Sequence, residues 1–155
     1  MYRITQEELS DLIMDNRENM YRLAYSIVRN DADTQEAVSE AVVLAFEKRH
    51  QLRKRTSAKA WIMQILVNAS KRILVQSKRI ILSGDENQFE QTAAFAGDEM
   101  WAVIMELDEE FKEVIVLYYY EQFSVKEISK ILKIPEGTIK SRLSRARKKL
   151  SKIIE

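Results

Sequence analysis

Residues Ser124–Leu150, SVKEISKILKIPEGTIKSRLSRARKKL, decide the fold of the C-terminal part of this chain. Ser124 lies three residues before Glu127, a spacing that is typical of a capping box at the start of a helix. Pro135, the only proline, predicts that this helix ends before it and that a second helix begins just after it. Two short helices joined by a three- or four-residue turn predict a helix-turn-helix.

The second of these helices separates an apolar face from a basic one. At about 100° per residue, its apolar positions fall within about 60° of one another. These positions are Ile139, Leu143, Ala146 and Leu150. The remaining faces carry Lys, Arg and hydroxyl side chains, which suit the bases and phosphates of a major groove. The candidate DNA-binding residues are Thr138, Lys140, Ser141, Ser144, Arg145, Arg147 and Lys148. A basic face exposed only to water is the alternative.

Charged residues are grouped along the chain, although the net charge of the whole is only +1. Residues 53–82 carry eight basic and no acidic side chains, and residues 124–155 carry ten basic and three acidic ones. Residues 1–52 and 83–123 have net charges of −4 and −10. Because local field governs attraction to phosphate, two basic patches favour two contacts with one polyanion. Solvated helix faces are the alternative explanation.

Residues that interrupt helices are scarce, with three Gly and one Pro in 155 residues. Apolar residues recur at helical spacing over much of the chain. The predicted helices are 5–29, 34–49, 58–79, 99–107, 109–121, 124–132 and 136–153, with a turn at 30–33, a basic loop at 50–57 and Ser57 as a helix cap. We therefore expect an all-α protein with two small helical domains, residues 1–79 and 99–155, joined by a flexible acidic linker of residues 80–98.

The sequence argues against several other classes of protein. Without cysteine the chain has no disulfides and no thiolate metal sites, and we expect no cofactor and no metal. His50, the only histidine, lies in the basic stretch HQLRKRTS and is expected in solvent rather than in an active site. The chain lacks a Gly-rich phosphate loop, an HExxH motif, a signal-peptide pattern and an apolar run of 18 residues. We therefore expect a non-enzymatic cytoplasmic protein that does not insert into the membrane.

The stretch Gly137–Arg147, GTIKSRLSRAR, is similar to the signature "GTVKSRLxRAR" of the extracytoplasmic-function (ECF) sigma factors. These proteins are small transcription-initiation subunits of RNA polymerase with two helical domains. Residues Leu107–Ile115 resemble the helix that precedes the motif in the family. The resemblance implies that residues 99–155 recognise the −35 promoter element.

Two stretches of the N-terminal half resemble the same family. Asp33–Phe46, DTQEAVSEAVVLAF, is similar to "DAEDLVQETFLRAW", with Glu36, Ser39 and Val42 where the family has Asp, Gln and Phe. Ala58–Gln76 is similar to "FRAWLYRIARNLAIDHLRR", with matches that include Trp61 and Asn68. We expect Trp61 in the core, with a stacking platform for a base as the alternative. For Asn68 a contact with DNA and a surface amide bonded to water remain alternatives.

The resemblance implies two sites in this half. The first would bind the clamp helices of the largest polymerase subunit and comprises Glu36, Ser39, Glu40, Val43 and Glu47. The second would hold the −10 element, where the strands separate, with the loop 50–57 as the place where an unstacked base is captured. Its candidate residues are Arg53, Lys54, Arg55, Asn68, Lys71 and Arg72.

The implied partners are core RNA polymerase (through the clamp helices and the flap of the second-largest subunit), promoter DNA and an anti-sigma factor, with the free protein a monomer. The linker, with Asp85, Glu86 and Glu90, would run through the polymerase. The aromatic residues Phe89, Phe95 and Tyr118–Tyr120 belong either to a partner surface or to the core. The alternative function is a dimeric helix-turn-helix repressor or activator on a palindrome, which has no need of the basic patch at 53–79.

Overall fold

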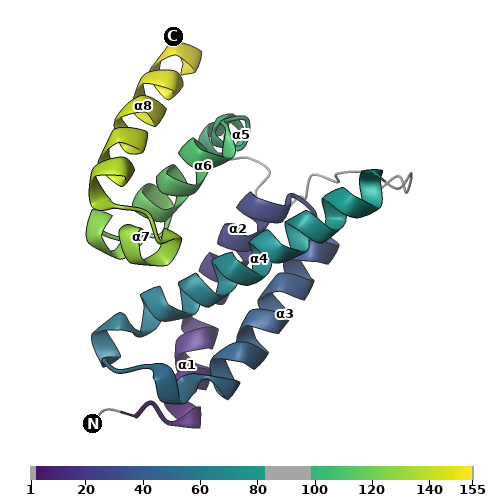
Figure 1. Cartoon of the computed structure of the whole chain (residues 1–155), viewed down its shortest axis with the longest axis vertical. Coiled ribbons are helices and arrows are strands. Elements are labelled where there is room, and N and C mark those ends of the chain that lie inside the picture. The colour runs from purple at the N-terminus through teal and green to yellow at the C-terminus, as the bar shows by residue number, and fades with distance from the viewer. Residues whose placement is uncertain (1–2, 83–98, 155) are drawn as a thin grey trace. The chain divides into compact units, whose positions relative to one another are not determined.

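The computed structural model describes residues 3–82 and 99–154, with the backbone alone for residues 79–82. All regular elements in these residues are helical, and the chain divides into two compact units, Met1–Glu90 and Gln91–Glu155 (Figure 1). The predicted all-α fold with two helical domains is therefore confirmed. The expected linker lies outside the described residues, apart from the backbone of residues 80–82, which continues the preceding helix.

The N-terminal unit begins with two helices where one was predicted. Helix α1 (Gln6–Asp15) starts at Thr5, whose hydroxyl accepts a hydrogen bond from the backbone N–H of Glu8 at 3.1 Å. Helix α2 (Arg17–Val28) follows after a break at Asn16. The Asn16 side chain donates to the Leu12 carbonyl at 2.8 Å, so it competes with the helical hydrogen-bond ladder. The single predicted helix over 5–29 was wrong at this point.

Asn30 connects α2 to α3 (Asp31–Glu47) in a tighter turn than predicted. Arg29 ends α2 in the left-handed conformation, with φ of 66°. The Asn30 side chain then accepts from the backbone N–H of Asp33 at 2.8 Å and so caps α3. As a result α3 begins three residues earlier than the predicted start at residue 34.

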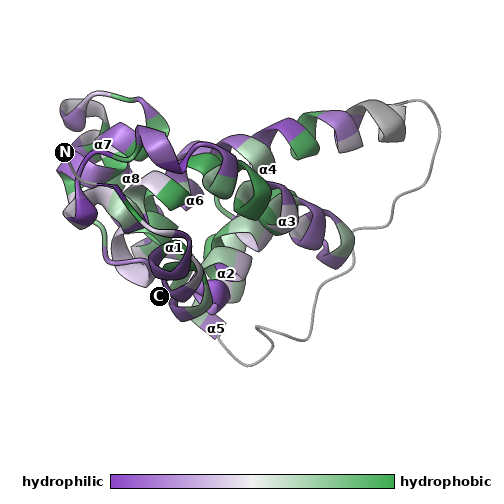
Figure 2. Cartoon of the chain, turned by 90° about the horizontal axis from the view of Figure 1, so that it is seen from below, coloured by the Kyte–Doolittle hydropathy of each residue, from purple (hydrophilic) through white to green (hydrophobic). Residues whose placement is uncertain are grey.

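Helix α4 (Ala58–Leu82) packs against α2 and α3 to form the core of this unit (Figure 1). Small side chains on α3, at Ala37, Ala41 and Ala45, are fully buried and allow α4 to approach closely. Figure 2 shows hydrophobic and hydrophilic segments alternating along α4, as expected for a helix with one buried face. Ile62, Met63, Leu66 and Ile73 are buried on that face. Trp61 is only half-buried, so the expectation of a core tryptophan was wrong.

Two 3-10 turns, η1 (Arg49–Gln51) and η2 (Arg55–Ser57), connect α3 to α4 across the predicted basic loop. Ser57 lies inside η2, and Ala58 follows with helical dihedral angles. Ser57 therefore directly precedes α4, as predicted for its cap, and is itself part of a helical turn that runs into α4.

The C-terminal unit contains α5 (Glu99–Met105), α6 (Glu109–Ile115), α7 (Val125–Leu132) and α8 (Glu136–Ile154). Helix α6 continues into a π-helical turn, η4 (Val116–Tyr120), in which the Glu121 N–H donates to the Val116 carbonyl at 3.0 Å. Helices α6 and α8 lie side by side, and α7 packs on α8 (Figure 1). The core of the unit includes Trp101, Phe111, Leu117, Ile128 and Leu143.

Candidate nucleic-acid and polymerase interfaces

The turn between α7 and α8 is held by local hydrogen bonds. The predicted capping box is present, with Ser124 and Glu127 exchanging hydrogen bonds of 3.1 and 3.0 Å. Lys133 adopts the left-handed conformation, with φ of 57°, and ends α7. The Ser129 hydroxyl then donates to the Ile134 carbonyl at 2.6 Å, and the Pro135 carbonyl accepts the Ile139 N–H at 3.1 Å. These contacts fix the angle at which α8 leaves the turn.

Helix α8 presents its two faces as the sequence predicts. Ile139, Leu143 and Ala146 are buried, and Leu150 is half-buried. Of the candidate −35 residues, Thr138 is half-buried and the other six are exposed: Lys140, Ser141, Ser144, Arg145, Arg147 and Lys148. An α-helix fits the width of a major groove, and an outer face of this composition can donate to bases and phosphates.

Two basic residues of α8 lie at its edges and make contacts within the unit. Arg142 is half-buried, with its guanidinium 3.9 Å from the Glu110 carboxylate and 3.7 Å from that of Glu113, both on α6. On the other edge, Arg147 Nε donates to the Tyr119 hydroxyl at 2.6 Å. The sequence assigned Arg147 to DNA and Tyr119 to a partner surface or the core, because a contact between residues 28 positions apart has no local signal.

The loop before α4 exposes its basic side chains to solvent. Leu52 and Ala58 are buried and anchor its two ends, while Arg53, Lys54 and Arg55 between them are exposed. On α4 the candidate residues are less uniform. Asn68 is exposed and Lys71 is half-buried. The exposed Arg72 forms an ion pair with Glu40 of α3.

The candidate polymerase-binding residues share one face of α3. Their spacing of three or four residues keeps them on the side opposite the buried alanines. Glu36, Ser39 and Glu47 are exposed, Glu40 is half-buried, and Val43 is 56% exposed.

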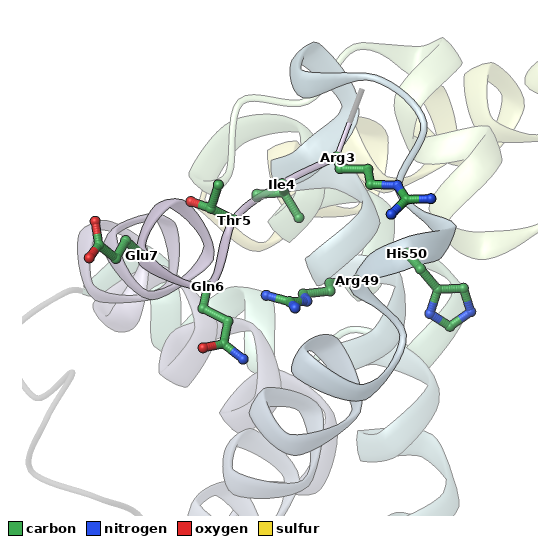
Figure 3. Close-up of a pocket in the computed structure, with 7 residues that line it drawn as sticks. All are labelled: Arg3, Ile4, Thr5, Gln6, Glu7, Arg49 and His50. Carbon is green, nitrogen blue, oxygen red and sulfur yellow. The ribbon is translucent and has the colours of Figure 1, made fainter. Parts of the chain in front are cut away.

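An open hollow of about 690 Å³ lies beside the basic loop (Figure 3). One wall comes from Arg3–Glu7 at the start of α1, and the other from Arg49 and His50 in η1. Figure 3 shows that Arg49 points toward Gln6, whereas Glu7 points away from the basic side chains. The hollow is therefore electropositive. The sequence pointed to the loop 50–57, with His50 expected in solvent, but not to Arg3, since only the fold brings the N-terminal segment to this place.

The described residues show neither a metal centre nor a membrane span. Within residues 3–82 and 99–154, no three His, Asp or Glu side chains cluster as metal ligands. None of the described helices combines the length and the hydrophobicity that a bilayer crossing requires.

Comparison with protein families gives two matches that together span most of the chain. The model of Sigma-70 region 2 matches residues 12–80, and that of Sigma-70, region 4 matches residues 97–150. The boundaries of these matches correspond to the two helical units.

Individual relatives match over almost the full length. RNA polymerase sigma factor SigV of Bacillus subtilis is 29% identical over 148 residues, covering 93% of this chain and 89% of SigV. ECF RNA polymerase sigma factor SigW of the same species is 23% identical over 166 residues, covering 95% and 89%.

Solved structures show the same fold. The sigma factor RpoE from Bartonella quintana, crystallised with the anti-sigma factor NepR, has a TM-score of 0.79 at 20% identity, with 96% of this chain and 97% of that one covered. CnrH, in complex with the cytosolic domain of CnrY, has a TM-score of 0.70 at 21% identity, with 97% and 89% covered. The chain therefore belongs to the sigma-70 family, as an ECF sigma factor, a non-enzymatic factor that directs promoter recognition and transcription initiation by RNA polymerase.

Proposed function

We propose that this sigma factor binds a promoter at two places. Helix α8 lies in the major groove of the −35 element, and the loop 52–57 and α4 contact the −10 element. One observation carries the proposal: the side of α8 opposite its buried residues is an exposed row of Lys, Arg and Ser. Ser141, Arg145 and Lys148 belong to this row, and Lys140 lies exposed on its flank.

At the −35 element each exposed side chain has a role that suits its chemistry. Arg145 can donate two hydrogen bonds to one guanine, so it is assigned to base recognition. Lys140 and Lys148 are single charges that hold phosphates and position the helix. Ser141, Ser144 and Thr138 add short hydrogen bonds to bases or backbone. Arg147 instead bonds to Tyr119 within the same unit.

At the −10 element the task is to hold separated strands. Opening costs stacking energy of about 1.4 kcal/mol per base-pair step, which capture of an unstacked base offsets. Arg53, Lys54 and Arg55 are exposed for contact with single-stranded phosphates, and Asn68 offers an amide to a base edge. The hollow beside the loop supports this assignment, because the guanidinium groups of Arg3 and Arg49 on its walls attract phosphate.

The exposed face of α3 is assigned to the clamp helices of the largest polymerase subunit. Its carboxylates, at Glu36, Glu40 and Glu47, complement a basic partner, and Val43 supplies apolar contact. The C-terminal unit is assigned to the flap of the second-largest subunit. A protein that makes both contacts would act in the cytoplasm together with the polymerase.

An anti-sigma factor is a further proposed partner. RpoE from Bartonella quintana is bound to an anti-sigma factor in its crystal structure, and CnrH is bound to the cytosolic domain of CnrY. A protein that covers the α3 face of this chain would block polymerase, and one that also covers α8 would block DNA as well.

Run-off transcription with purified core polymerase on a genomic promoter library tests the proposal. Addition of the protein should produce transcripts from a small set of promoters that share −35 and −10 sequences. A matched variant with Lys140, Ser141 and Arg145 changed to Ala should lose these transcripts but still co-elute with core polymerase. Failure of the unaltered protein to co-elute, together with dimeric binding to a palindrome, would favour a conventional repressor or activator instead.

A further inference from the structure

Helix α8 makes side-chain contacts along both of its edges, and the sequence does not predict these contacts. At about 100° per residue, Arg142 and Arg147 project to opposite sides of the buried stripe of the helix, about 140° apart. Each meets a different partner in the C-terminal unit: Arg142 meets carboxylates of α6, and Arg147 meets tyrosines of η4. The outward-facing Ser141, Arg145 and Lys148 lie on the side between these two contacts that is away from the core.

The contact at η4 is made of aromatic rings and one hydrogen bond. The Arg147 guanidinium lies 5.7 Å from the centre of the Tyr118 ring and 5.6 Å from that of Tyr119. The two rings themselves meet edge to face, with centres 5.0 Å apart. Arg147 Nε also donates to the Tyr119 hydroxyl, so one hydrogen bond adds to the two ring contacts.

The π-helical turn explains how two consecutive tyrosines reach one arginine. A π-helix fits more residues into each turn than an α-helix, so neighbouring side chains are less widely spread around the axis. Tyr119 remains 50% exposed, which means that the core does not require it. Its ring and hydroxyl are turned toward α8 and serve the contact with Arg147.

The edge at Arg142 is more enclosed. Glu113 is buried, and the Arg142 side chain is half-buried between α6 and α8. Lys149 lies on the same edge, with its ammonium 5.2 Å from the centre of the Phe111 ring on α6. Rotation of α8 about its own axis would break contacts on one edge or the other.

We infer that Tyr119 and Arg147, with Arg142 on the opposite edge, are positioning residues that set the rotation of α8, and that Arg147 acts through Tyr119 rather than as a DNA ligand. This inference rests on the proposed function of α8. A rotation by one residue position, about 100°, would replace the exposed row with different side chains, so even a partial rotation would misplace Arg145. We call the contacts of Arg147 with Tyr119 and of Arg142 with Glu110 and Glu113 the brace. The brace therefore determines which base pair Arg145 contacts.

Two substitutions separate positioning from DNA binding. Arg147→Lys keeps the positive charge that a phosphate contact needs, but it loses the Nε donor and the flat guanidinium. Tyr119→Phe keeps the ring and removes only the hydroxyl. Holoenzyme carrying each variant, and the double variant, is titrated with a promoter obtained by run-off selection and with the same DNA after scrambling of the −35 element, at several salt concentrations.

We expect both single variants to lower the preference for the intact −35 element by roughly two- to tenfold, the range that loss of one hydrogen bond gives. The double variant should show the same −35 preference as Arg147→Lys alone, because the two substitutions remove the same hydrogen bond. The salt dependence should stay unchanged in all three, whereas Lys148→Ala lowers its slope by about one. Tyr21→Phe, a matched change in the other unit, should alter none of these values.

Two results would overturn the inference. One is full activity of Arg147→Lys combined with a slope lowered by about one in Arg147→Ala, which identifies a phosphate ligand. The other is a Tyr119→Phe defect that adds in full to that of Arg147→Lys.

Hydrogen–deuterium exchange of the full chain without DNA tests the brace separately from the proposed function. We expect faster exchange of the α8 amides in Tyr119→Phe and Arg147→Lys, and unchanged exchange would contradict the brace. Unaltered holoenzyme could bind intact and scrambled −35 DNA equally while the variants still show faster exchange in α8. In that case the assignment of α8 to DNA is wrong and the brace is supported.

Discussion

Arg72 of α4 forms an ion pair with Glu40 of α3, and so joins a residue expected at the −10 element to one expected at the polymerase. The hydrogen bond that Arg72 donates to Glu40, and then the negative charges of Glu40 and Glu36, raise the pKa of the Arg72 guanidinium above its ordinary value. Because the Arg72 side chain is 51% exposed, the pair contributes at most about 1 kcal/mol to stability. Its importance lies in linking the two proposed interfaces.

Glu40→Gln removes one charge from the pair and keeps the shape of the side chain. We expect the free energy of unfolding to fall by less than about 1 kcal/mol, and the affinity for core polymerase to fall severalfold if the clamp contact is correct. Urea unfolding and fluorescence anisotropy with core polymerase measure the two effects. Glu18→Gln, an exposed acid on α2, is the control for polymerase binding. Undiminished polymerase affinity would remove Glu40 from that interface.

The sequence predicted those parts of the fold that depend on local patterns. The faces of α8 and the capping box at Ser124 follow from residue spacing alone, and both are present. The break at Asn16 was missed because a side chain took a backbone carbonyl within an otherwise regular apolar pattern. The π-helical turn at Val116–Tyr120 was missed as well, since the sequence around it keeps helical periodicity.

Arg145→Ala should weaken binding at the −35 element by about 1–3 kcal/mol and relax the preference at one base pair, because a side chain that pairs with a base edge is lost. Binding of holoenzyme to promoters in which each −35 base pair is varied in turn measures the effect. Lys152→Ala, also exposed on α8 but seven positions further along, should leave every base preference intact. Equal discrimination by Arg145→Ala and the unaltered protein would assign base recognition elsewhere.

The candidate sites were predicted as sets of residues, but not their pairing. Exposure of Arg53, Arg145 and Lys148 follows from helix and loop patterns. The partners of Arg72 and Arg147 depend on how distant helices pack, which periodicity does not encode. A basic side chain in a DNA-binding motif therefore has two possible tasks, and only tertiary structure separates them.

Ser70→Ala should raise the free energy of unfolding by about 1 kcal/mol, because a buried hydroxyl without a partner costs desolvation energy and Ala is the better helix former. Ser70 is fully buried on α4, and among the described residues its Oγ makes no hydrogen bond. Urea unfolding of the full chain measures the change. Ser26→Ala is the matched control: Ser26 is also buried, but its hydroxyl donates to the Leu23 carbonyl at 2.5 Å, so its loss should not stabilise. A less stable Ser70→Ala protein would mean that the hydroxyl has a partner such as a buried water.

Gly137→Ala should stabilise the free protein and weaken its binding to DNA. Gly137 is the second residue of α8, and a methyl group added there would meet no atom within 4 Å, so nothing in the fold requires glycine. Alanine should raise the free energy of unfolding by about 0.4–1 kcal/mol by restricting the unfolded chain.

A phosphate bound at the start of α8 would instead meet the added methyl group of Gly137→Ala, since backbone N–H groups at a helix N-terminus hold phosphate at close range. Thermal unfolding and −35 binding by holoenzyme measure the two opposed effects, with Ser151→Ala on the same helix as the control. Unchanged DNA binding in a stabilised Gly137→Ala protein would show that the DNA backbone does not approach α8 at this position.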